Sequence, residues 1–267
     1  MDEQKHKRIM IEAEKLRKMY AEDPRQKTFN ALVLGKHGSG KTFLLRSARK
    51  PIHIDSFDPG GAKGLRDLIA TGDVIVDSRY ESENPRKPFA FDLWCKEMAE
   101  RERMGYFEAI GTYCIDSATT WSDAIMNSIL KKAGLAGESP RWSHDYVPQK
   151  VTIENWLHEL LSLPCDFFLT GHLEGQKDEV SGQMLYQFMT TGKGAIKIPL
   201  LFDEIYIMDP KKTSAGVEYR LLTQATGTYT ARSRLAANGL LDTYEKPDIK
   251  NMLKKVGLSS EDKPKLF

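Results

Sequence analysis

The sequence predicts an α/β protein with a mainly parallel sheet, and two observations support this prediction. An apolar, β-prone run over 29–34 leads into a glycine-rich loop, and a helix-prone run over 43–48 follows it. Further apolar runs alternate with helix-prone segments, and each ends in a polar residue; they cover 52–55, 74–77, 111–117 and 165–172. Strands that alternate with helices form parallel sheets, and ligands bind at the carboxyl ends of such strands.

The glycine-rich loop, residues 35–42, fits the pattern G-x-x-x-x-G-K-[ST] at every fixed position. Its backbone N–H groups point into one concavity, and the helix N-terminus adds partial positive charge, so the loop is expected to bind nucleotide phosphates. Lys41 is expected to contact the β- and γ-phosphates, and the Thr42 hydroxyl to bind Mg²⁺. The remaining residues expected at the nucleotide are Gly35, His37, Gly38, Ser39, Gly40 and Phe43. The chain has no Asn-Lys-x-Asp motif for reading guanine, which disfavours a GTPase and favours ATP.

Composition excludes several other classes of protein. The chain has 267 residues, 40% hydrophobic and 28% charged, which suits one soluble domain with appendages. We expect a cytoplasmic protein without membrane contact, because no apolar run approaches a membrane span and no signal-peptide region follows the N-terminus. Cys95, Cys114 and Cys165 are scattered singly, which predicts buried thiols. With a net charge of only +2, any nucleic-acid surface must be a local patch.

Three segments are expected along the chain. Residues 1–27 form a helical arm, in which Ile9, Ala13, Leu16 and Tyr20 fall on one face; it is either a subunit-docking helix or an arm packed on its own core. Residues 28–237 form the core, which closes with two late strands over 201–208 and 218–224, joined by a turn at 209–212. Residues 238–267 form a short helix and a tail.

Two polar strand ends are candidates for the chemistry beside the phosphate loop. Asp116 ends an apolar strand, as a carboxylate that holds the Mg²⁺ shell must do. His172 ends the next apolar strand, where it can hydrogen-bond the γ-phosphate or its attacking water; the alternative is a structural histidine.

In their order along the chain, these motifs resemble the RecA-like ATPases over residues 28–237. The resemblance implies a three-layer P-loop core with late antiparallel strands. Cys114-Ile115-Asp116-Ser117 is similar to the family's Walker B strand, and His172 falls where RecA has a sensing Gln. Asp55-Ser56-Phe57-Asp58 resembles the strand end that carries the catalytic carboxylate, but Phe57 stands in direct register. The general base is therefore open between Asp58 and Asp55.

The same resemblance implies contacts to DNA and to a second subunit. The segment 190–197, Thr-Thr-Gly-Lys-Gly-Ala-Ile-Lys, resembles the end of RecA's second DNA-binding loop. We therefore expect 173–198 to be a mobile loop on single-stranded DNA, with Lys177, Lys193 and Lys197 on phosphates and Tyr186 and Phe188 on bases. Arg232 and Arg234 sit where the family carries a basic pair that reaches the neighbouring subunit's nucleotide, which implies a homo-oligomeric ring or filament.

The chain is most similar to compact phage RecA-type ATPases, which include single-strand annealing and recombination proteins. This implies a DNA-stimulated ATPase in the host cytoplasm that works with phage recombination or replication proteins. Two alternatives remain open. One is a component of a packaging or helicase-type motor, and the other is a nucleotide-gated binding module with weak hydrolysis, suggested by the missing glutamate at position 57.

Overall fold

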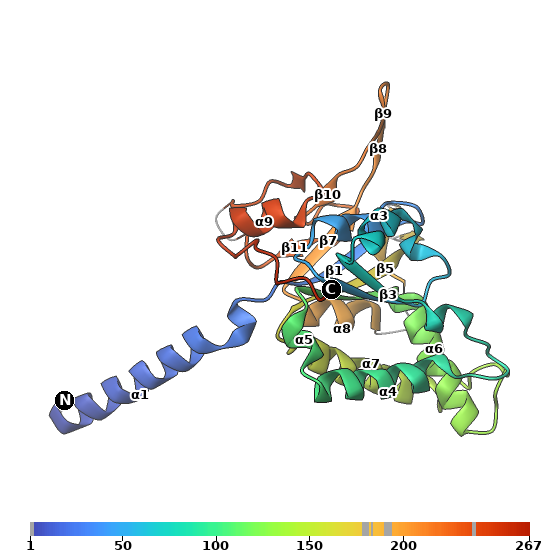
Figure 1. Cartoon of the computed structure of the whole chain (residues 1–267), viewed down its shortest axis with the longest axis horizontal. Helices are drawn as coiled ribbons and strands as arrows, with labels where there is room; N and C mark the ends of the chain where they lie inside the picture. Colours follow the sequence, from blue (N-terminus) through green and yellow to red (C-terminus); the bar gives the residue numbers. More distant parts are fainter. Residues whose placement is uncertain (1–2, 178–181, 183, 190–193, 237–238) are drawn as a thin grey trace.

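A mixed sheet forms the centre of the molecule (Figure 1). The computed structural model describes residues 3–177, 182, 184–189, 194–236 and 239–267. The strand order is β12-β10-β7-β1-β5-β4-β2-β3. These strands are β1 (Asn30–Gly35), β2 (Ile52–Ser56), β3 (Val74–Asp77), β4 (Thr112–Asp116), β5 (Asp166–Lys177), β7 (Glu204–Met208), β10 (Leu221–Leu222) and β12 (Tyr244–Glu245).

The strands from β7 to β3 are parallel, and the late strands are antiparallel, which confirms the predicted fold class. Two further strands, β6 (Met184–Phe188) and β11 (Arg232–Ser233), pair antiparallel with β5 and β7. The register places Gly35 beside His172 and Ser56 beside Asp116. The carboxyl ends of β1, β5, β4 and β2 therefore meet along one edge of the sheet, where the predicted site residues lie.

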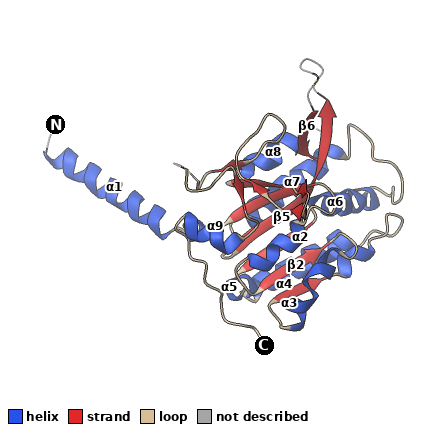
Figure 2. Ribbon diagram, turned by 90° about the horizontal axis from the view of Figure 1, so that it is seen from above, coloured by secondary structure: helices blue, strands red, loops and turns tan. Residues whose placement is uncertain are grey.

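Helices cover both faces of the sheet and give three layers (Figures 1 and 2). Large side chains such as Trp94, Trp121 and Phe202 fill the core on one face. The helices there are α4 (Ala90–Arg103), α5 (Tyr106–Ala109), α6 (Ala118–Lys132), α7 (Tyr146–Leu160) and α8 (Gly194–Leu201). The other face packs Leu44, Leu65 and Met252 against the strands. Its helices are α2 (Lys41–Leu44), α3 (Arg66–Ala70) and α9 (Ile249–Lys255).

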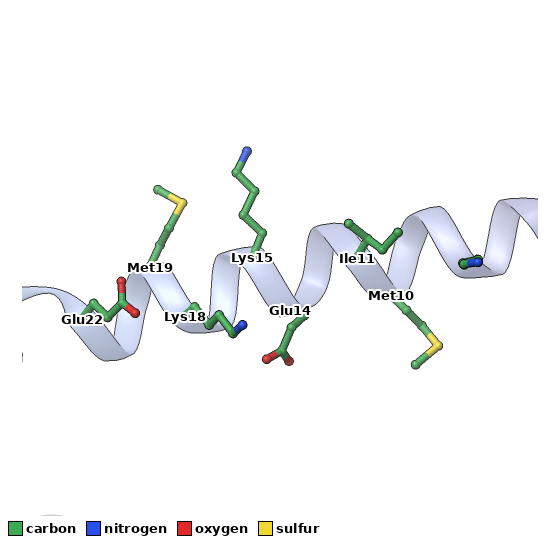
Figure 3. Close-up of a pocket in the computed structure, with 8 residues that line it drawn as sticks. Met10, Ile11, Glu14, Lys15, Lys18, Met19 and Glu22 are labelled. Carbon is green, nitrogen blue, oxygen red and sulfur yellow. The ribbon is translucent and has the colours of Figure 1, made fainter.

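The N-terminal helix α1 (Glu3–Glu22) points away from this body and has no buried residue (Figures 1 and 2). Figure 3 shows side chains of α1, including Met10, Lys15 and Met19, leaving the helix in different directions. The hollow drawn there is lined only by residues of α1, so it has no second wall. The structure contradicts an arm packed on its own core, and subunit docking stays a prediction.

Several expected segments differ from the structure. The turn expected at 209–212 is part of a protruding hairpin of β8 (Lys211–Thr213) and β9 (Gly216–Glu218), and the second late strand is only Leu221–Leu222. In the expected mobile loop, β5 continues to Lys177 and pairs with β6, and α8 follows. Antiparallel pairing supplies the backbone hydrogen bonds that a loop would leave to water. Cys114 and Cys165 are buried as predicted, but Cys95 is only partly so.

Deletion of residues 1–22 is expected to leave the core folded, because α1 buries no side chain. The free energy of unfolding of a monomeric sample should change by less than about 0.5 kcal/mol, the usual range for surface changes. Urea denaturation followed by tryptophan fluorescence measures this, with the full chain as the control. A loss of several kcal/mol would show that α1 stabilises the core of its own subunit.

Candidate nucleotide-binding site

The phosphate loop joins the carboxyl end of β1 to the single-turn helix α2. Gly38 and Gly40 have φ angles of 70° and 94°, in the left-handed region that favours glycine. A Cβ atom on Gly35 would lie 2.3 Å from the Ser39 hydroxyl oxygen, so this position also requires glycine. The Ser39 hydroxyl is buried and has no hydrogen-bond partner among the described residues. A buried polar group costs free energy unless it is paired, and a bound phosphate would supply the partner.

Lys41 lies folded back over this loop. Its Nζ donates to the carbonyl oxygens of Gly35 and Lys36, both at 3.2 Å. Burial lowers the pKa of Lys41, and the carboxylates of Asp116 and Asp58 partly oppose this shift. A buried cation held by carbonyl oxygens gains from a phosphate anion, as the motif predicts.

Asp116 is held by hydroxyl groups from two other elements. The Thr42 hydroxyl donates to Asp116 Oδ2 at 2.7 Å, and the Thr170 hydroxyl donates to Oδ1. Burial raises the pKa of Asp116, and these two hydrogen bonds work in the opposite direction. One carboxylate beside one hydroxyl is a hard oxygen donor set that suits Mg²⁺, which usually takes its remaining ligands from water and substrate phosphates. The residues therefore fit the metal, and Thr42 and Asp116 are the groups that would hold it.

Asp58 and His172 face the same pocket of about 320 Å³. Asp58 Oδ1 accepts a hydrogen bond from Thr120 at 2.7 Å, and Oδ2 lies 3.4 Å from His172 Nε2. Burial alone would raise the pKa of Asp58, but hydrogen bonds from His172, Thr120 and Ser117 hold it below its usual value. The other ring nitrogen of His172 lies 3.5 Å from Lys41 Nζ. An ionised carboxylate thus stands across the pocket from the lysine.

Asp55 lies outside this pocket, which contradicts its assignment as a candidate base. Its carboxylate is fully buried in a polar network under α4. It accepts hydrogen bonds from Trp94 at 2.9 Å, from Arg101 at 2.9 and 3.0 Å, and from Tyr113 at 2.5 Å. The reason is position, because Asp55 lies inside β2, whereas Asp58 follows the end of the strand, where the loops at the carboxyl ends meet. Asp58 is left as the candidate base.

Three residues of the site were not predicted from the sequence. Glu81 accepts hydrogen bonds from Ser56 Oγ at 2.7 Å and from the backbone N–H of Gly60 at 3.0 Å, and so fixes the loop that carries Asp58. It comes from a 3₁₀ turn that carries no motif, so only the fold brings it here. Thr120 and Thr170 are the other two. Thr170 precedes His172 by two residues, and this spacing on a strand was a usable signal.

Of the predicted DNA-stacking residues, Phe188 is contradicted. It is 3% exposed, and its ring lies 2.6 Å from where a Cβ on Gly171 would be, so it belongs to the core. Tyr186 is half-buried; its ring stacks on Tyr229 with centroids 5.2 Å apart, and its hydroxyl accepts from Lys36 at 3.2 Å. Lys177 and Lys197 are exposed. Lys193, with Thr190, Thr191 and Gly192, lies outside the described residues.

Arg232 and Arg234 lie away from the phosphate loop of their own chain. The strand β11 pairs with the first residues of β7, whereas the loop follows the carboxyl end of the parallel strand β1. Arg232 donates to the carbonyl oxygen of Phe202 at 2.6 Å, and Arg234 forms an exposed ion pair with Asp203 at 2.6 Å. Neither arginine faces the pocket of its own subunit. Their action on a neighbouring subunit stays a prediction, and Arg232 already has partners within its own chain.

This arrangement places a phosphate loop at the carboxyl ends of a mainly parallel sheet in a three-layer α/β fold. Residues 27–235 match a family model described as an AAA domain. The match spans most of the chain, so the protein belongs to the AAA domain family, and membership of this family indicates nucleotide binding and hydrolysis.

Two other comparisons, with solved structures and with curated proteins, add nothing to this family assignment. One similar solved structure is a KaiC-like protein from the hyperthermophilic archaeon Pyrococcus horikoshii, which is 13% identical, with coverage of 77% of this chain and 83% of that one and a TM-score of 0.42. The comparison with curated proteins finds no match. Within the described residues, no helix is long and apolar enough to span a membrane.

Two variants are expected to separate the role of Asp58 from that of Asp55. Asp58→Asn should keep the fold and nucleotide binding but lower ATP turnover by about 100-fold or more, the usual loss of a general base. Asp55→Asn should instead lower the free energy of unfolding by about 3 kcal/mol, because it removes the buried carboxylate that pairs with Arg101 and leaves only Asp77 as the ion-pair partner of this arginine. Turnover assays and urea denaturation of both variants measure these effects.

The effect at Asp55 also has a predicted pH dependence. Burial would raise the pKa of Asp55, but His53 and Arg101 hold it below its usual value. A lowered pKa stabilises the fold above the unfolded value, near pH 4, and this stabilisation is lost as the pH falls further. The difference between parent and Asp55→Asn should therefore shrink below about pH 4.

For the other variant, equal ATP turnover in the parent and in Asp58→Asn would show that Asp58 takes no part in the chemistry.

Proposed function

We propose that this protein hydrolyses ATP in a Mg²⁺-dependent reaction. The observation that carries the proposal is the convergence of Lys41, Asp116 and Asp58 on one pocket beside the phosphate loop. Each group comes from a different strand end or loop, and together they supply the cation, the metal ligand and the base that phosphoryl transfer to water needs.

Each residue of the pocket has a separate role in this reaction. Lys41 and the loop N–H groups bind the phosphates and stabilise the charge that develops on them. Asp58, ionised and held by Thr120, orients a water molecule and accepts its proton. His172 lies between Asp58 and Lys41, where it can hydrogen-bond the γ-phosphate and change partner when that group leaves. Mg²⁺ at Thr42 and Asp116 would neutralise phosphate charge.

Lys41→Ala is expected to lower ATP turnover by at least about 100-fold while the protein stays folded, because the side chain serves phosphate charge. Lys132→Ala is the matched control, since Lys132 is exposed at the end of α6. Phosphate release and circular dichroism measure the two properties. Parental turnover in a folded Lys41→Ala protein would contradict the proposed hydrolysis.

We further propose that the substrate of the assembled protein is single-stranded DNA, in phage annealing or homologous recombination, with the protein acting as a ring or filament. The support is the likeness of 190–197 to a DNA-binding loop. Lys177 at the end of β5 and Lys197, the last residue of this segment, are both exposed. Arg234, exposed and directed away from its own pocket, is the candidate for contact with a neighbouring nucleotide.

Lys177→Ala and Lys197→Ala should each reduce the dependence of single-strand binding on salt. Each lost phosphate contact lowers the slope of log K against log salt by about 0.7 for single strands. Lys254→Ala, an exposed lysine on α9, is the control. Fluorescence anisotropy of a labelled oligonucleotide from 50 to 300 mM salt, roughly the range in which such slopes are read, measures this. Unchanged slopes in both variants would place the DNA elsewhere.

A second candidate, a nucleotide-gated binding module with weak hydrolysis, has one observation in its favour. Phe57 occupies the position of the missing glutamate, and it is buried and stacked on Tyr80 with centroids 4.9 Å apart. Turnover that is slow and unchanged by single-stranded DNA would support this candidate. Directional, force-coupled turnover on duplex DNA would support a motor.

A further inference from the structure

A second pocket lies directly beside the phosphate pocket. Gly40 and Phe43 line both, so the two pockets adjoin at the phosphate loop. The second pocket has a volume of about 550 Å³, enough for a nucleoside. Its remaining walls come from α2, the end of β7, the residue after β9 and the residues before α9: Leu44, Arg46, Ser47, Met208, Tyr219, Lys246 and Pro247.

Flat side chains dominate the mouth of this pocket. Tyr219 lies against the phosphate loop, because a Cβ atom on Gly40 would be 3.3 Å from two atoms of its ring. Phe43 follows Thr42 and is 59% exposed. Arg46 lies over the Phe43 ring, with its guanidinium carbon 5.0 Å from the ring centroid. Exposed aromatic rings beside a phosphate site are surfaces on which a base can stack.

Arg46 and Ser47, two of the polar side chains that line the pocket, are engaged within the protein, whereas the side chain of Lys246 is exposed. Arg46 donates to both carboxylate oxygens of Asp67, at 2.6 and 2.5 Å. These bonds occupy the N–H groups on one edge of the guanidinium and leave its flat face for contact with a ligand. The Ser47 hydroxyl donates to the Leu44 carbonyl oxygen at 2.8 Å and accepts from the Ile249 N–H at 2.9 Å. A base in this pocket would thus meet faces more than hydrogen-bonding groups.

The direction of the nucleotide follows from the phosphate pocket. Asp58 and His172 stand beside Lys41, which fixes the γ-phosphate end there. The nucleoside end must therefore extend away from these groups. The second pocket lies on the other side of Gly40 and Phe43, where it can receive the nucleoside.

We propose that this second pocket binds the base of the nucleotide, stacked on Tyr219 and Phe43, and that the site accepts adenine and guanine triphosphates alike. This inference rests on the proposed function, because it assumes that a nucleoside triphosphate occupies the phosphate loop. Recognition of the flat face tolerates either purine, since every base has such a face.

The test measures the Kd of ATP, GTP and inorganic tripolyphosphate, each with Mg²⁺, for the parent, Tyr219→Ala, Tyr219→Phe and Val217→Ala. Val217 is the matched control, because it is exposed on the same hairpin but does not line the pocket. Tyr219→Ala should weaken ATP about tenfold and leave tripolyphosphate unchanged, since stacking on one aromatic ring is worth about 1–3 kcal/mol. Tyr219→Phe should restore ATP binding, and parental ATP and GTP constants should agree within about threefold.

The outcomes separate this inference from the proposed function. A parent that binds neither ATP nor tripolyphosphate removes both. A parent that binds the two equally well, or a folded Tyr219→Ala protein with parental ATP affinity, overturns the base pocket alone. A preference of about 100-fold for one purine overturns recognition by the face. Tyr219 is 49% exposed, so the variant should fold, and the parental comparison of ATP with tripolyphosphate needs no variant.

Discussion

The hydrogen bonds that Asp116 accepts hold the site together. This carboxylate ends β4. One partner, Thr42, follows β1 at the phosphate loop, and the other, Thr170, comes from β5, which lies between β1 and β4 in the sheet. Three chain segments that are distant in sequence are fixed to one another through a single group. Because the group is buried, any partner lost would leave a polar atom unpaired at a cost of about 1–3 kcal/mol. The geometry of the proposed metal ligands is therefore built into the packing of the sheet.

Asp55, fully buried in β2, and Asp58, partly buried on the loop after this strand, illustrate how burial alone does not define a catalytic group. Asp55 and Asp58 are three positions apart, and both have a lowered pKa. Asp55 is enclosed by the aromatic side chains of α4 and β4 and pairs with an internal arginine. Asp58 lies on the loop after the strand and faces the phosphate pocket. What separates their roles is their position along the chain: Asp55 lies within β2 under α4, whereas Asp58 follows the strand and reaches the phosphate pocket.

Much of the fold and the centre of the site could be predicted from the sequence. The phosphate loop and Asp116 each directly follow or end an apolar strand. Both could be predicted because neighbouring residues alone form these patterns. Glu81 and Thr120 could not be predicted, because only the neighbouring positions of β2, β4 and their loops bring them to Asp58. Phe188 was misjudged because an aromatic residue in a polar stretch looks exposed until β6 pairs with β5 and turns it into the core.

In the proposed assembly, α1 would extend from the body of its own subunit toward a neighbour. Its 20 residues at about 1.5 Å each span about 30 Å, comparable to the diameter of a small domain. A binding group that is tethered in this way has a raised effective concentration for a molecule that other contacts already hold nearby. A contact too weak to join two free molecules becomes sufficient once other contacts have brought their bodies within reach of the arm.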